Sequence, residues 1–123
     1  MYLCSDHYPI LMTSPRIQQL IEFLNDNPND PFLLYALATE YLKAGQTADA
    51  LRYYERLRTD HPDYVGTYYH LGRLYESLGE RDSAIATYRQ GMEVAQQKRD
   101  RHALSELQAV YQSALGLDED DED

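Results

Sequence analysis

The sequence of 123 residues contains no tryptophan, a single cysteine and few cationic residues. One cysteine, Cys4, cannot form an internal disulfide, so we expect a protein of a reducing compartment, the cytoplasm. No apolar run approaches the roughly 20 residues that span a bilayer, so we expect no membrane association. Lys and Arg number 11 against 21 Asp and Glu, which gives a net charge of −10. This acidity argues against nucleic acid as a partner, because phosphates attract cations.

Residues that carry catalysis are also scarce. The glycines are scattered along the chain, so they form no phosphate-cradling loop. Cys4 has no fixed basic neighbour that would activate its thiol as a nucleophile. Of the four histidines, only His70 and His102 are placed to approach each other, and a metal site would need further ligands within reach. The sequence therefore predicts no enzyme activity, no cofactor and no metal site.

What the chain does contain is an internal repeat. Apolar and small residues of the segment 37–54 recur 34 positions later in the chain. The repeated pairs are Leu37 and Leu71, Ala38 and Gly72, Tyr41 and Tyr75, Gly45 and Gly79, Ala50 and Ala84, and Tyr54 and Tyr88. A period of this length indicates stacked repeats, in which one unit cannot bury its apolar face alone. Proteins of this type usually act by binding.

The period and the residue types resemble the tetratricopeptide repeat family. The family pattern is a Leu followed by a small residue and a Tyr in the first helix, then a small residue, an aromatic residue and a closing Pro. The first unit matches to its end at Pro62, whereas the second has Gln96 in place of the Pro. Tyr68 stands where the family often carries Trp. The resemblance implies a fold and not a partner, because this fold serves many partners.

The fold implied by the resemblance is all-α, a right-handed superhelical stack of antiparallel helix pairs. Two full repeats would be flanked by a half unit and by a C-terminal capping helix, where the polar Gln108 replaces the small residue of the repeats. The expected helices cover about 15–26, 31–44, 48–60, 65–78, 82–98 and 101–115, within a domain of 14–116. Residues 1–13 are expected to be a disordered leader and residues 117–123 a disordered acidic tail.

Local signals place several helix ends. Ser14 before Pro15, and an Asp-Pro pair at 30–31, each combine a capping side chain with a proline at the first helical position. Thr47 is expected to cap the helix that follows it. Gly45 and Gly79 are expected to end the first helix of each repeat in the left-handed conformation.

The resemblance also implies a binding site, because the first helix of each repeat in this family lines a concave groove that holds peptides or helices. Tyr35 and Tyr69 are expected to be neighbours on the groove floor, either contacting the ligand or packing within the protein. Arg73 would either contact the ligand or pair with Glu76 or Glu40. The full set of expected groove residues is Phe32, Tyr35, Thr39, Tyr69, His70, Arg73, Glu76 and His102.

The same positions argue against one ligand class. Family members that hold the terminal carboxylate of chaperones do so with Lys, Asn and Arg along the groove. The matching residues here are Tyr35, Thr39, His70, His102 and Glu106. None of these is of the required type, and the Glu106 carboxylate would repel the ligand. An aromatic or apolar ligand, with a cationic group near Glu76 and Glu106, fits the sequence better.

The leading hypothesis for function is a cytoplasmic protein–protein interaction adaptor that binds a peptide or helix in this groove. The alternative is a self-associating structural module, a homodimer through its terminal helices with no separate ligand. The six acidic residues at 118–123 are either a solvating end, a docking segment for a basic partner, or a weak calcium-binding segment.

Overall fold

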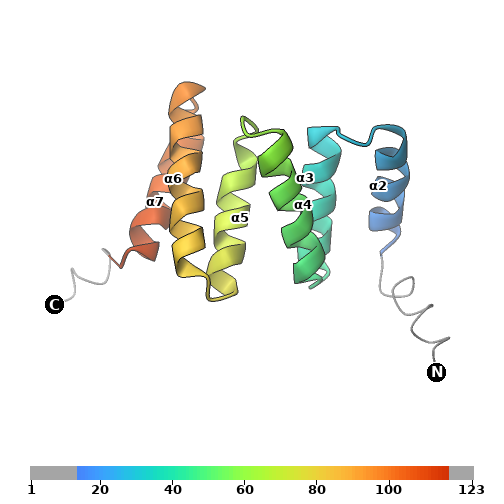
Figure 1. Ribbon diagram of the computed structural model, residues 1–123, viewed down its shortest axis with the longest axis horizontal. Helices are drawn as coiled ribbons and strands as arrows, with labels where there is room; N and C mark the ends of the chain where they lie inside the picture. Colours follow the sequence, from blue (N-terminus) through green and yellow to red (C-terminus); the bar gives the residue numbers. More distant parts are fainter. Residues whose placement is uncertain (1–13, 117–123) are drawn as a thin grey trace. The chain divides into compact units, whose positions relative to one another are not determined.

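The computed structural model describes residues 14–116 and shows six α-helices and no strand in this range. The expected leader, 1–13, and the expected tail, 117–123, lie outside the described residues. The helices are α2 (Pro15–Asp26), α3 (Pro31–Lys43), α4 (Thr47–Asp60), α5 (Gly66–Ser77), α6 (Arg81–Gln97) and α7 (Arg101–Ala114), drawn in Figure 1. The expected all-α helical repeat fold is confirmed. None of the described helices is both long enough and apolar enough to cross a membrane.

The chain divides into two compact units, residues 1–53 and 54–123, with the boundary inside α4. In the first unit, α2 and α3 pack side by side (Figure 1). The buried side chains of α2 are Ile17, Leu20 and Leu24, and those of α3 are Leu33, Leu34, Leu37, Ala38 and Tyr41. The Tyr41 ring stacks on the Tyr53 ring of α4, with centroids 5.6 Å apart. Helical spacing of these apolar residues therefore builds the core of the unit.

Two helices begin with the caps that the sequence predicts. The Ser14 side chain accepts a hydrogen bond from the backbone N–H of Ile17 at 3.1 Å, and Pro15 is the first residue of α2. The Asp30 carboxylate accepts one from the N–H of Phe32 at 2.9 Å, before α3. Each such cap stabilises a helix by about 1 kcal/mol. Thr47 differs from the prediction, because it is the first residue of α4 and not the cap that precedes it.

Four helices are followed by a residue in the left-handed conformation, Gly116 (φ 82°) after α7 among them, and three of these ends share one hydrogen-bond motif. Gly45 (φ 79°) follows α3 and Gly79 (φ 78°) follows α5, as predicted. The third residue is Arg99 (φ 58°), after α6. In each case the next N–H reaches back five residues to a helix carbonyl, as Asp100 does to Ala95 at 2.9 Å. No sequence pattern marks Arg99 as such a position, because residues other than Gly and Asn rarely occupy this conformation.

The core of the second unit depends on two glycines that admit two tyrosine rings. A Cβ atom on Gly72 of α5 would lie 2.1 Å from the ring of Tyr88, and one on Gly91 of α6 would lie 2.4 Å from Cβ of Tyr68. Both tyrosines are fully buried, together with Ala84, Ala95 and Leu107. The small residue expected at position 72 is thus required by a close approach of α5 and α6.

The last helix, α7, packs against α6 and also contacts α5 (Figure 1). Leu107 is its one fully buried side chain among the described residues. Leu104 and Tyr111 are half-buried, whereas Gln108 is exposed. A polar residue on the outer face is what a terminal helix requires, because no further helix covers that face within the described residues.

Candidate partner-binding surface

The eight expected groove residues are divided between the two units. Phe32, Tyr35 and Thr39 lie on α3 in the first unit. Tyr69, His70, Arg73 and Glu76 lie on α5, and His102 lies on α7, all in the second unit. The expected proximity of Tyr35 and Tyr69 therefore stays a prediction, because these two residues belong to different units.

On α3, the three expected residues share one side of the helix. Spacings of three and four residues place Phe32, Tyr35 and Thr39 above one another. The Phe32 side chain is 63% exposed, although large apolar side chains are usually buried. Tyr35 and Thr39 are half-buried. The side of α3 that carries Leu34 and Leu37 is buried completely, so the exposed aromatic ring lies away from the core.

On α5, Tyr69 and Arg73 are one turn apart and contact each other. The Arg73 guanidinium carbon lies 5.9 Å from the centre of the Tyr69 ring, within the range of a cation–π contact. An Arg73 N–H also donates to the Tyr69 hydroxyl at 3.4 Å. The sequence suggested an ion pair of Arg73 with Glu76 or Glu40, but it did not predict this contact with the Tyr69 ring. Arg73 is exposed and Tyr69 half-buried, so the pair forms a pre-oriented polar and aromatic surface.

His70 lies between two tyrosine rings. The Tyr54 ring of α4 is stacked on it with centroids 6.0 Å apart, and the Tyr69 ring meets it edge-on at 5.4 Å. Burial lowers the pKa of His70, and the negative charge of Glu106 partly opposes that shift. The imidazole is consequently neutral at pH 7. Tyr54 was expected only as a core residue, and the repeat pattern carries no signal for its stacking role.

Glu106 of α7 connects the two histidines electrostatically. Its carboxylate lies 3.2 Å from Nε2 of His102, one turn away, and its charge also acts on His70. The sequence had placed Glu106 at a groove-matching position, although not in the set of expected groove residues. The residues 14–116 contain no group of three or more His, Cys, Asp or Glu side chains that could hold a metal ion.

Glu76 lies on α5 close to the buried Tyr88. The Tyr88 ring packs over Gly72, and its hydroxyl has no hydrogen-bond partner of good geometry among the described residues. Burial raises the pKa of the Tyr88 hydroxyl, and the Glu76 charge raises it further. The half-buried Glu76 carboxylate is therefore partly exposed to solvent and also affects the buried Tyr88 hydroxyl electrostatically.

A second polar cluster joins three helices of the same unit. The Arg58 guanidinium donates to both carboxylate oxygens of Glu55, at 2.8 and 2.9 Å, and to the Thr87 hydroxyl at 3.3 Å. The Tyr75 hydroxyl donates to the same Glu55 carboxylate. Burial, followed by the hydrogen bond and charge of Glu55, raises the pKa of Tyr75 to about 12. This Glu55 cluster links α4, α5 and α6 and is distinct from the Tyr69–Arg73 surface.

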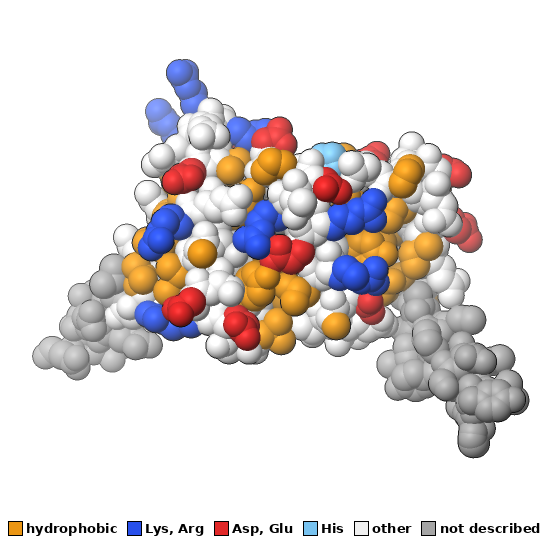
Figure 2. Space-filling view, viewed as in Figure 1, with side chains coloured by type: hydrophobic (Ala, Val, Ile, Leu, Met, Phe, Trp, Pro, Cys, Tyr) orange, Lys and Arg blue, Asp and Glu red, His pale blue; other side chains and the backbone are white. Residues whose placement is uncertain are grey.

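The surface drawn in Figure 2 carries charged side chains of both signs, interspersed with hydrophobic ones. No broad area of this face carries one sign of charge alone. A large patch of Lys and Arg is typical of a surface that binds nucleic acid. The face drawn in Figure 2 has no such patch.

Comparison with known proteins identifies several related chains. The family model of the tetratricopeptide repeat matches residues 41–109. The crystal structure of a tetratricopeptide repeat domain protein from Salinibacter ruber is 53% identical and covers 72% of this chain and 98% of its own, with a TM-score of 0.69. The solution structure of a tetratricopeptide repeat domain protein from the same organism is also 53% identical, covering 73% and 91%, with a TM-score of 0.70.

A further solved structure shows the same fold at low identity. A protein from Bordetella parapertussis is 22% identical and covers 86% of this chain and 92% of its own, with a TM-score of 0.73. At that identity the similarity concerns the fold alone. No curated protein matches the sequence significantly.

Proposed function

Because the chain belongs to the tetratricopeptide repeat family, whose members generally bind other proteins, we propose that it is an adaptor that holds a peptide or helix of a partner protein. The proposed contacts are the first-helix residues Phe32, Tyr35, Thr39, Tyr69, His70, Arg73 and Glu76, together with His102. The proposal includes a cytoplasmic location, supported by the single cysteine, and no catalytic activity.

The observation that carries this proposal is the Tyr69–Arg73 pair. A guanidinium that already rests on a tyrosine ring has lost part of its side-chain freedom before any partner arrives. Tyrosine and arginine are also the residues that most often dominate binding energy at protein interfaces. The exposed Phe32 supports the same function on the first unit, since it offers a large apolar contact.

The chemistry of the surface favours an aromatic or apolar ligand with a cationic group. Glu106 is half exposed and its present partner, His102, is an exposed histidine. A Lys or Arg of a ligand would compete for this carboxylate, because the side chain of either residue is charged at neutral pH. A ligand with a terminal carboxylate is disfavoured. Arg73 is the one Lys or Arg among the eight proposed contacts, and the Glu106 carboxylate would repel the carboxylate of the ligand.

Affinity capture from the native lysate with matched double variants tests the adaptor function. Phe32→Ser with Arg73→Glu changes an exposed phenylalanine and an arginine that rests on a tyrosine. Phe23→Ser with Arg89→Glu makes the same chemical changes elsewhere, because Phe23 is 51% exposed and the Arg89 guanidinium lies 5.8 Å from the Tyr111 ring. We expect the first variant to lose captured partner by about tenfold or more and the second to retain it.

The competing function, a homodimer through the terminal helices, has one observation in its favour. The exposed Phe23 lies on α2, the first described helix. If both double variants retain full capture, the proposed surface is wrong. If only the variant at Phe23 and Arg89 loses it, the interaction uses the surface at Phe23 of α2 or the surface where Arg89 of α6 lies on Tyr111 of α7. Sedimentation over a concentration series then shows whether the captured partner is a second copy.

A further inference from the structure

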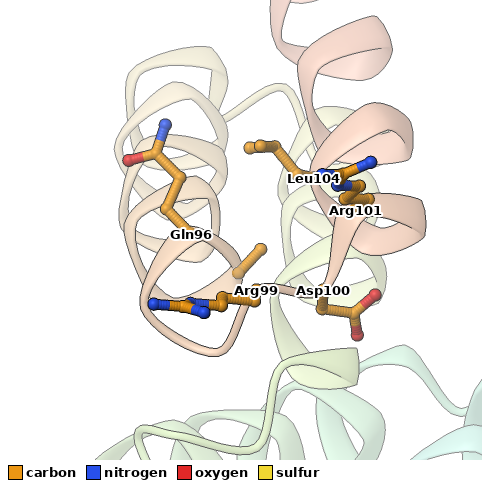
Figure 3. Close-up of a pocket in the computed structure, with 6 residues that line it drawn as sticks. Gln96, Arg99, Asp100, Arg101 and Leu104 are labelled. Carbon is orange, nitrogen blue, oxygen red and sulfur yellow. The ribbon is translucent and has the colours of Figure 1, made fainter.

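A pocket of about 230 Å³ lies where α6 ends and α7 begins, and neither Tyr69 nor Arg73 lines it. Its apolar part is formed by Ala95 and Leu104, and Figure 3 shows Leu104 pointing from α7 toward α6. Its polar lining consists of Gln96, Arg99, Asp100 and Arg101. The pocket thus combines a small apolar floor with a polar rim that carries two arginines.

The segment 98–101, which supplies three of the four rim residues, is the most basic part of an acidic chain. Lys98, Arg99 and Arg101 occupy three of four consecutive positions, whereas the whole chain has a net charge of −10. All three side chains are exposed, and none forms an ion pair within residues 14–116. The Asp100 carboxylate is engaged by the backbone N–H of Ala103 at 3.0 Å. The cations are therefore available to an anionic ligand.

The backbone at the rim is fixed before a ligand arrives. Arg99 is in the left-handed conformation (φ 58°), and the N–H of Asp100 returns to the carbonyl of Ala95 at 2.9 Å. This motif ends α6 and immediately precedes the Asp100 cap of α7. The positions from which Arg99 and Arg101 project are consequently set by the turn, which reduces the entropy lost on binding.

The chain itself contains a segment with complementary chemistry. Residues 117–123 consist of one leucine, Leu117, followed by six consecutive acidic residues. A single apolar side chain next to a run of carboxylates matches a small apolar floor next to three cations. We propose that the pocket between α6 and α7 binds the segment 117–123 of a second copy of this chain.

A second copy is required because the segment's own Leu117 cannot reach the floor. Leu104 and Ala114 are ten residues apart on α7, which at 1.5 Å per residue is about 15 Å. Gly116 stays at the end of the helix, with its N–H 3.0 Å from the carbonyl of Ser113. Leu117 is the next residue, so its Cα lies within about 3.8 Å of that of Gly116 and remains beyond side-chain contact with Leu104. The association is therefore head to tail, with the pocket of one copy facing the acidic segment of the next.

Sedimentation velocity of the full chain over a concentration series tests this proposal. We expect the wild type to associate and the variant Arg99→Glu with Arg101→Glu to need about tenfold higher concentration, since two attractive contacts become repulsive. The matched control is Arg52→Glu with Arg89→Glu, which changes the net charge equally at exposed arginines. Equal behaviour of the two variants would overturn the pocket as the contact.

Charge exchange identifies the occupant. A variant with Asp118→Lys, Asp120→Lys and Asp121→Lys should not associate with itself, but it should associate with the Arg99→Glu, Arg101→Glu variant when the two are mixed. Failure of this pair to associate, with both variants shown to be helical by circular dichroism, overturns the proposal.

A synthetic peptide of residues 115–123 provides a measurement that does not depend on the variants. It should bind the wild-type chain and reverse the association, more weakly as salt is raised, whereas the same peptide with Leu117→Ser should bind less tightly. Peptide binding to a chain that stays monomeric at all concentrations contradicts the second copy. Capture at the Tyr69–Arg73 surface is unaffected by either result, so this proposal and the adaptor function fail separately.

Discussion

At the scale of single residues, contact between a glycine and a tyrosine ring determines how closely α5 and α6 pack. We expect Gly72→Ala to destabilise the protein by about 1–3 kcal/mol, because its Cβ would overlap the buried Tyr88 ring. Chemical denaturation measures this change. The opposing gain in helix propensity from alanine is smaller, about 0.5–1 kcal/mol.

A double-mutant cycle separates the overlap from other effects of the alanine. In a Tyr88→Leu background the ring is absent, so Gly72→Ala should cost much less than in the wild type. An equal cost in both backgrounds would show that the overlap with the ring is not the cause.

His70 gives a residue-scale prediction about pH. Its pKa is lowered in the folded state by burial among Tyr54 and Tyr69, with Glu106 partly opposing. The unfolded chain therefore takes up a proton first as the pH falls below about 6.5, and the folded state loses stability down to its own lower pKa. We expect thermal unfolding between pH 7 and 5 to show this loss.

The variants His70→Gln and His102→Gln distinguish this source of pH dependence. His70→Gln should flatten the profile over that range, because the buried titrating group is gone. His102→Gln serves as the control, since this side chain is 85% exposed and should change the profile little. A profile that stays steep in His70→Gln would assign the dependence to another group.

At the scale of helices, the ends of the elements follow local chemistry, and one end departs from it. Arg99 occupies the left-handed position that glycine holds at Gly45 and Gly79. We expect Arg99→Gly to stabilise the fold by roughly 0.5–1 kcal/mol. The left-handed conformation costs a residue with a side chain about 1–2 kcal/mol, and glycine removes this strain. Part of the gain is offset because glycine raises the conformational entropy of the unfolded chain. Denaturation midpoints measure it.

The neighbouring Lys98 is the control for this helix end. It has right-handed dihedrals (φ −88°, ψ −3°), so Lys98→Gly removes no strain and should destabilise the protein. Equal effects of the two glycine substitutions would show that the backbone of Arg99 stores no strain.

At the scale of the whole molecule, each unit is held by its own core, and polar links join helices within it. The Glu55 cluster connects α4, α5 and α6 in the second unit. The pKa of Tyr75 is raised from 10.0 to about 12 in the folded protein. The neutral Tyr75 hydroxyl therefore stabilises the fold below pH 10, and this contribution is lost as the pH rises toward 12.

Tyr75→Phe tests the contribution of this hydroxyl to alkaline stability. We expect unfolding free energy to fall less steeply between pH 10 and 12 in the variant than in the wild type. Tyr111→Phe is a suitable control, because the hydroxyl of this half-buried tyrosine of the same unit accepts from Arg89 at 3.2 Å, outside this cluster. The same slope in wild type and Tyr75→Phe would show that Tyr75 does not contribute to the alkaline transition.

Local sequence patterns were sufficient to predict the repeat family, the all-α fold and the caps at Ser14 and Asp30. These depend on features of residues that are close in the chain, namely the helical periodicity of apolar residues, the capping side chains and the glycines that end helices. The 34-residue period also identified the buried Tyr54 and Tyr88, because repeated positions occupy repeated environments.

Which polar and aromatic groups meet depends on how the helices pack, and no local pattern predicts it. The stacking of Tyr54 on His70, the Glu55 cluster and the apolar floor formed by Ala95 and Leu104 join residues from different helices. Their distances depend on how helices cross and on how a backbone turn such as that at Arg99 aims the next element. Periodicity states which side of a helix is buried, but it does not state which neighbouring side chain lies opposite.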